Sequence, residues 1–174
     1  MHTFCTYDYY TMRISSKNAI CLSVVGFLTV LTAVCGTAEV AQASTFYVDS
    51  TADTVDATPG DGVCDDGAGS CSLRAAIMEA NALVGADIID APAGTFTLTI
   101  PGERENAALT GDLDITDELT ITGAGESSTI IDGGGIDRVL EVIAAGNITD
   151  ITIQNGAGSF EEAAGAGIYN TSQQ

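Results

Sequence analysis

Short aliphatic segments separated by glycine-rich turns fill the second half of the chain. From residue 86 onward the apolar residues come in pairs and alternations, and the predicted strands lie at 88–89, 96–100, 113–115, 119–121, 130–131, 139–142, 148, 151–153 and 168–169. Strands this short, with glycine at most corners, favour a solenoid of stacked coils with about three strands per coil. The predicted fold class is therefore all-β, a right-handed parallel β-helix whose coils occupy residues 86–174. Its aliphatic side chains should point inward, and its threonines and aspartates outward.

A single amphipathic helix is predicted before the first coil, at residues 72–84. Ser72 can cap its start, because a serine side-chain oxygen accepts a hydrogen bond from an unpaired backbone N–H. Gly85 is the expected C-cap. The apolar face recurs at helical spacing and comprises Leu73, Ala76, Ile77, Ala80 and Leu83. The two ends of a solenoid need covers, so Leu73, Ile77 and Ala80 are expected to lie over the interior of the first coil.

The region ahead of this helix is expected to complete an N-terminal cap that spans residues 44–85. Residues 45–49 read as a short strand, and residues 50–71 form a glycine- and aspartate-rich loop. No comparable element follows residue 170, which predicts that the chain is the front of a longer β-helix. A β-sandwich is disfavoured, since no tight turn joins two alternating strands of equal length.

Residues 1–43 have the three parts of a secretory signal peptide. Arg13 and Lys17 precede a nearly unbroken apolar run, 19–34, and Ala41-Gln42-Ala43 forms a small-residue cleavage site ahead of Ser44. A membrane anchor is the alternative, but the run is shorter than the ~20 residues a spanning helix needs. Lipid attachment at Cys35 is disfavoured by the bulky Val34. Translation can also start at Met12. The expected mature chain is exported and begins at Ser44.

The chain is strongly acidic, with a formal net charge of −19 at pH 7. After residue 43 its basic residues are Arg74, Arg104 and Arg138, and it has no lysine there. Such a surface repels phosphate backbones and anionic membranes, so neither nucleic-acid binding nor membrane insertion of the mature chain is expected. The abundant aliphatic residues argue against disorder.

Two cysteines remain after export, Cys64 and Cys71. An even pair in an exported chain favours a disulfide, here closing a small ring; two free thiols are the alternative. Zinc is not expected, because the chain's one histidine, His2, precedes the cleavage site.

The run from Cys71 to Ala82, Cys-Ser-Leu-Arg-Ala-Ala-Ile-Met-Glu-Ala-Asn-Ala, resembles the signature of the CSLREA domain. The preceding segments 51–56 and 59–64 share this resemblance, and Ala75 stands where that family has glutamate. The glycine-rich corners at 129–135 and 165–170 look like those of polymorphic outer-membrane-type surface proteins. The resemblance implies a bacterial protein, secreted or at the cell surface or outer membrane, and supplies no catalytic residue.

Calcium is the candidate ligand of the acidic loop. Asp56, Asp61, Asp65 and Asp66, with Asp53 nearby, offer the hard oxygen ligands that Ca²⁺ prefers. The alternative is a solvated loop held by the disulfide. Arg74, the cation nearest this loop, is expected to bind a loop carboxylate or carbonyl and fix the helix to it.

The predicted function is a structural or binding module without catalysis of its own, with carbohydrate or other surface proteins as partners. The alternative is the front part of a pectate-lyase-like or other polysaccharide-degrading enzyme, since such enzymes share the β-helix fold. On the predicted coils, the aspartate–arginine group that an enzyme would need is Asp132, Asp137 and Arg138. The alternative is that these residues form an ion pair beside a turn, which contributes little when it is exposed to solvent.

Overall fold

The computed structural model describes residues 41–102, 105–158 and 167–171, and the predicted leader lies outside these residues up to position 40. The described residues from 41 onward form one compact unit. Its elements are β1 (Thr45–Tyr47), α1 (Leu73–Ala82), β2 (Asp87–Ala91), β3 (Gly94–Thr97), β4 (Leu113–Ile115), β5 (Leu119–Gly123), β6 (Thr129–Asp132), β7 (Leu140–Val142), β8 (Gly146–Thr149), β9 (Thr152–Gln154) and β10 (Ile168–Asn170). In this part of the chain no helix has the length and apolar character needed to cross a bilayer.

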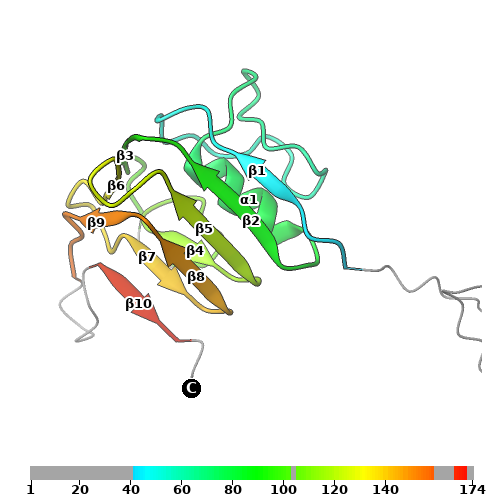
Figure 1. Ribbon diagram of the computed structural model, residues 1–174. Helices are drawn as coiled ribbons and strands as arrows, with labels where there is room; N and C mark the ends of the chain where they lie inside the picture. The colour runs from blue at the N-terminus through cyan, green and yellow to red at the C-terminus, as the bar shows by residue number, and fades with distance from the viewer. Residues whose placement is uncertain (1–40, 103–104, 159–166, 172–174) are drawn as a thin grey trace, which may run out of the picture. The chain divides into compact units, whose positions relative to one another are not determined.

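The strands form three parallel sheets and enter them in rotation. One sheet has the order β1-β2-β5-β8, the second β3-β6-β9 and the third β4-β7-β10. After β2, β3 and β4 have each joined a different sheet, β5 returns beside β2 and the sequence repeats (Figure 1). Every described strand pair is parallel, so the predicted all-β parallel class is confirmed.

Inward-facing aliphatic side chains stack between neighbouring strands. Ile89 pairs with Ile121 in one sheet, and Phe96 pairs with Ile131 in another. All four are buried and belong to one hydrophobic core. Burial of such side chains contributes about 1.5–3 kcal/mol each, which makes this stacked interior the main source of stability.

Helix α1 starts as predicted and ends earlier than predicted. The Ser72 side chain accepts from the N–H of Ala75 at 3.0 Å, so Ser72 is the N-cap. The predicted C-cap at Gly85 is wrong. The C-cap is Leu83, whose N–H donates to the carbonyls of Glu79 and Ala80. Leu83 is already extended, at φ −92° and ψ 155°, so the helix closes without a left-handed glycine.

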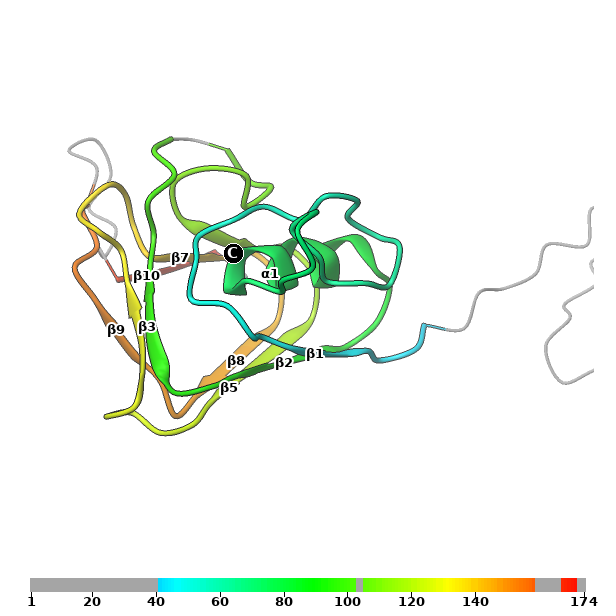
Figure 2. The ribbon, with the colours of Figure 1, turned by 90° about the horizontal axis from the view of Figure 1, so that it is seen from above.

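The apolar face of α1 covers the interior of the first coil-like turn of strands. Leu73, Ile77 and Ala80 are at most 2 % exposed and join the same core as the strand residues. Seen from above, α1 lies across the space that the three sheets enclose (Figure 2). The opposite face is also buried, because Arg74, Ala75 and Glu79 are at most 1 % exposed.

The burial of Arg74 and Glu79 goes beyond the sequence analysis, which predicted one apolar face for the helix and a contact between Arg74 and the loop. Glu79 accepts hydrogen bonds from the backbone N–H groups of Gly60 and Gly62. The loop 50–71 therefore wraps the outer face of α1. Gly60 and Gly62 have positive φ, and this backbone brings both N–H groups to one carboxylate. Cys64 and Cys71 form the predicted disulfide, with their Cα atoms 5.2 Å apart.

Ile77→Ala tests whether α1 is part of the core. Ile77 is fully buried, so the substitution should lower the free energy of unfolding by about 2–5 kcal/mol. Val84→Ala, just past the helix at 69 % exposure, is the matched control and should change it by at most about 0.5 kcal/mol. Urea unfolding measures both. Equal effects would show that the helix does not seal the core.

Candidate functional site

Three acidic side chains gather at the third sheet, two on its strands and one just before β4. Asp114 of β4 lies directly opposite Glu141 of β7, which in turn lies opposite Tyr169 of β10. Asp112 precedes β4 by one residue. One carboxylate oxygen from each of Asp112, Asp114 and Glu141 lies within 4.8 Å of the other two, and all three residues are buried. This group, called the acidic cluster below, can hold a metal ion.

Arg138 contacts two members of the acidic cluster. Its Nε donates to Asp112 Oδ2 at 3.0 Å, and one terminal nitrogen donates to Glu141 Oε2 at 2.7 Å. Its guanidinium carbon lies 5.2 Å from the centre of the Tyr169 ring, within cation–π range. The side chains of Arg138 and Glu141 are 13 % and 10 % exposed, so these ion pairs are shielded from water.

Asp114 has one paired and one unpaired oxygen. Its Oδ2 accepts from the N–H of Ala108 at 2.8 Å, whereas its Oδ1 is buried without a hydrogen-bond partner in the described structure. Burial is the main reason that the pKa of Asp114 is raised from 3.8 to about 7, and the neighbouring carboxylates of Asp112, Glu105 and Glu141 add to it; the Ala108 hydrogen bond opposes the rise. Burial also raises the pKa of Asp112, against the opposing effect of Arg138.

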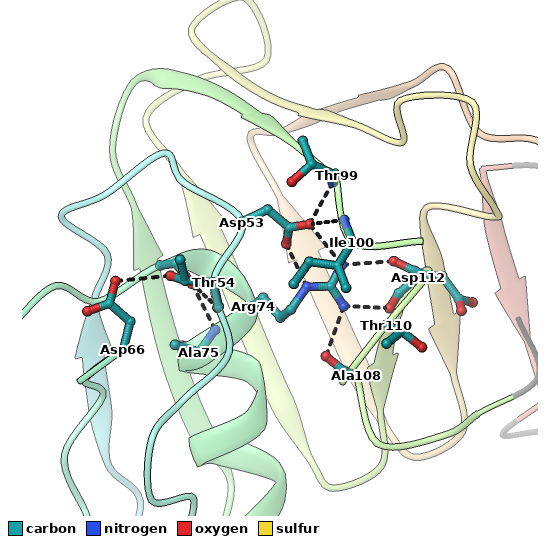
Figure 3. A network of polar contacts seen from close by, with 12 residues as sticks. Asp53, Thr54, Asp66, Arg74, Ala75, Thr99, Ile100, Ala108, Thr110 and Asp112 are labelled. Atoms are coloured by element: carbon teal, nitrogen blue, oxygen red, sulfur yellow. Dashed lines mark hydrogen bonds and ion pairs between the residues drawn. The ribbon is translucent and has the colours of Figure 1, made fainter. Parts of the chain in front are cut away.

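A second arginine holds the segment that carries Asp112. Arg74 projects from α1 and donates to the carbonyl oxygens of Ala108, Gly111 and Asp112 at 2.9, 2.8 and 3.2 Å (Figure 3). Its Nε also donates to Asp53 at 2.6 Å. The predicted pairing of Arg74 with a loop carboxylate or carbonyl is thus confirmed. The partner segments lie on both sides of the helix in sequence, so Arg74 joins the cap to the first turn of strands.

Asn81 fixes the strand that carries Asp114. Its Nδ2 donates to the carbonyl of Asp114 at 2.7 Å, and its Oδ1 accepts from the N–H of Thr116 at 2.9 Å. These two bonds replace the neighbour that β4 lacks on the side of α1, because β4 is the edge strand of its sheet. The helix therefore positions both aspartates of the acidic cluster, through Arg74 and Asn81.

The four loop aspartates predicted to bind calcium are engaged in turns of their own loop. Asp56 accepts from Thr58 and Asp65, and Asp65 from Gly67 and Gly69, each through a backbone N–H. Asp61 accepts from Thr58 and Val63. Asp66 accepts from the N–H groups of Ala68 and Ser70, which hold the pKa of its carboxyl below the ordinary value. A metal at this loop would compete with these hydrogen bonds.

The sequence singled out Asp132, Asp137 and Arg138, and the structure gathers a different set. Asp132 accepts hydrogen bonds from the side chains of Gln154, the last residue of β9, and of Asn155, which follows it. Asp137 accepts from the backbone N–H of Arg138 itself. Only Arg138 of the three is bound to the acidic cluster. The carboxylates of this cluster were missed because alternation placed Asp114 and Glu141, the middle residues of β4 and β7, toward solvent, and because Asp112 lies just before β4.

Comparison of the chain with family models, with curated proteins and with solved structures gave no match. The site is therefore defined by its geometry: a buried carboxylate group, one guanidinium spanning two of its members, and one carboxylate oxygen without a donor.

The raised pKa of Asp114 predicts a specific pH dependence of stability. The folded chain binds this proton more tightly than the unfolded chain, so the contribution is complete below pH 3.8 and is lost as the pH rises to about 7. Asp114→Asn keeps an acceptor for Ala108 and carries no charge. It should be more stable than the parent at pH 7.5 by about 2–4 kcal/mol, with the gap closing toward pH 4.

Urea unfolding at several pH values, in the presence of a chelator, measures this gap. Glu118→Gln, an exposed site four residues along the chain, is the control and should track the parent at every pH. A gap that stays constant from pH 4 to 7.5 would contradict an Asp114 proton held by burial.

Proposed function

We propose that the chain folds as a right-handed parallel β-helix that is exported and serves as a structural or binding module, secreted or at the cell surface. The rotation of successive strands among three parallel sheets carries this proposal, since a coil of three strands gives that order on each turn. A right-handed path is the hand that parallel crossovers adopt. The CSLREA-like cap, the disulfide and the acidic surface all suit an extracytoplasmic protein.

Carbohydrate is the partner class that the exposed face of the first sheet suits best. Tyr47 of β1 is 69 % exposed and borders a shallow hollow that Asp90, Pro92 and Thr122 also line. An exposed aromatic ring beside hydroxyl and carboxylate groups presents both the apolar and the polar contacts that a sugar ring offers.

We further propose that the acidic cluster binds calcium and ties neighbouring turns of the module together. Oxygen ligands of one Ca²⁺ lie 2.3–2.6 Å from the ion, so oxygens within 4.8 Å of one another can share it. The buried Oδ1 of Asp114 has no hydrogen-bond donor in the described structure, so it is free to coordinate a cation. The single positive charge of Arg138 does not balance three carboxylates. An ion bound here would join β4, β7 and the segment before β4, because these parts of the chain carry the three ligands.

Calcium should raise the melting temperature of the parent by several degrees at millimolar concentration, because an ion bound to the folded chain stabilises it by mass action. Asp114→Asn and Glu141→Gln should each abolish the shift. The loop variant Asp61→Asn/Asp65→Asn is the matched control and should retain it. A shift lost in the loop variant and kept in Asp114→Asn would place the ion in the acidic loop instead.

A polysaccharide-degrading enzyme is the second candidate, and the acidic cluster with Arg138 is the observation that favours it. Carboxylates and an arginine on one face of such a fold are the groups that acid–base chemistry on sugars uses. Their burial speaks for the structural role, because Asp112 and Asp114 are at most 1 % exposed and a substrate must touch its catalytic groups.

Incubation of the purified chain with polygalacturonate and calcium separates the two functions. The structural proposal predicts no reducing or unsaturated products above the buffer blank. Product formation that disappears in both Asp112→Asn and Glu141→Gln would establish the enzyme instead. Asp132→Asn, which alters an aspartate away from the acidic cluster, controls for a contaminating activity.

A further inference from the structure

A buried carboxylate, Asp87, lies beside Ser44, the residue that precedes β1, and one of its oxygens is unpaired in the described structure. Asp87 is the first residue of β2 and is 1 % exposed. Its Oδ1 accepts from the backbone nitrogen of Ser44 at 2.7 Å, whereas its Oδ2 has no hydrogen-bond partner in the described structure. Burying a carboxylate with only one donor and no described counter-charge is costly, so a further partner would stabilise the folded chain.

The nitrogen of Ser44 is held beside Asp87 by strand pairing. The carbonyl of Ser44 accepts from the N–H of Ile88 at 2.9 Å, and the next residue, Thr45, pairs with Ile88 in the parallel register of β1 and β2. Ser44 is half-buried, while residues 41–43 are exposed. The position of this nitrogen is therefore fixed by the sheet, and the preceding residues are open to a protease.

Ser44 is also the residue that signal-peptide cleavage after Ala43 would leave at the N-terminus. In the intact chain its nitrogen is an amide with one N–H. Hydrolysis of the Ala43–Ser44 bond by a signal peptidase consumes one water, gives Ala43 the new carboxylate and leaves Ser44 with an α-amino group. Near neutral pH this group is a cation with three N–H donors, since its ordinary pKa is about 8.

We propose that cleavage between Ala43 and Ser44 creates a terminal ammonium that forms an ion pair with Asp87 and fastens β1 to β2. The ammonium has donors for Oδ1 and for the unpaired Oδ2, and it supplies a positive charge where none of the described residues places one. The arginines that the structure describes are committed elsewhere, Arg74 to Asp53 and Arg138 to Asp112 and Glu141. This inference rests on the export proposed above.

The first test is where the chain is cut. The full chain is produced in a bacterium that exports it, and the intact mass of the exported product is measured. The inference requires a product that begins at Ser44. Cleavage at any other bond overturns it but leaves the exported module standing, whereas a chain that is never exported contradicts the proposed function itself.

The second test uses the absence of lysine after residue 43, which makes the terminal amine the one primary amine of the processed chain. Acetylation of the unfolded chain, followed by refolding, converts this amine back to an amide with a single N–H. Free and acetylated forms are compared by urea unfolding at pH 6.5, each with Asp87 and with Asp87→Asn.

Acetylation should weaken folding at least tenfold in equilibrium constant when Asp87 is present and less than twofold in Asp87→Asn, and this cycle isolates the pair. Asp90→Asn on the same strand is the matched control and should keep the full effect of acetylation. An equal effect of acetylation in the parent and in Asp87→Asn overturns the ion pair, even with the cut at Ser44.

The rate at which an amine-reactive reagent labels the folded chain gives a readout that does not depend on the stability of Asp87→Asn. Labelling of the parent should be several-fold slower than that of the same chain in denaturant at the same pH, because a paired ammonium is a poor nucleophile. Equal rates in the two conditions would overturn the pair.

Discussion

The hydrogen bonds and ion pair of the Arg74 guanidinium hold the cap, the helix and the first turn of strands together. Arg74 is 1 % exposed, and a buried charge persists only when it is paired and fully hydrogen-bonded. Asp53 supplies the counter-charge from the loop before the helix, and the 108–112 segment supplies three carbonyl oxygens. Asp53 in turn accepts from the N–H groups of Thr99 and Ile100. One side chain thus joins the cap, the helix and the first turn of strands, and truncating it would leave Asp53 buried without its partner.

The acidic cluster follows from this constraint. The 108–112 segment is held against the third sheet by Arg74, and the N–H of Ala108 then donates to Asp114. Alternation turns Asp114 away from the core, between Leu113 and Ile115, but the overlying segment removes it from water. Its carboxylate is left among other acids at low solvation, so its pKa rises to about 7. The same segment brings Asp112 beside Glu141 and gives Arg138 two partners.

The pattern of neighbouring residues in the sequence was enough to predict the strands and the helix, but not the acidic cluster. The triplet Leu113-Asp114-Ile115 is a strand because its alternation fits a half-buried sheet, and Ser72 caps α1 because of chemistry confined to four residues. Glu79 and Arg74 are bound by segments 17 and 38 residues away, and no periodicity encodes such contacts. The burial of Asp114 depends on the nearby 108–112 segment, which is itself held in place by Arg74. For the same reason the helical pattern does not show that Ala75, which lies off the apolar face, is fully buried.

The two unpaired buried oxygens, Asp87 Oδ2 and Asp114 Oδ1, have a common origin in the composition. A chain with 24 acidic and five basic side chains cannot neutralise its buried carboxylates from its own residues, and the two arginines described here already serve Asp53, Asp112 and Glu141. Positive charge must then come from another source, or the carboxylate must keep a proton. A terminal ammonium can reach Asp87, because strand pairing delivers it, but it cannot reach Asp114 on a different sheet. For Asp114 the sources are a solvent cation or a proton, and its convergence with two further carboxylates gives the cation the advantage of several ligands at once.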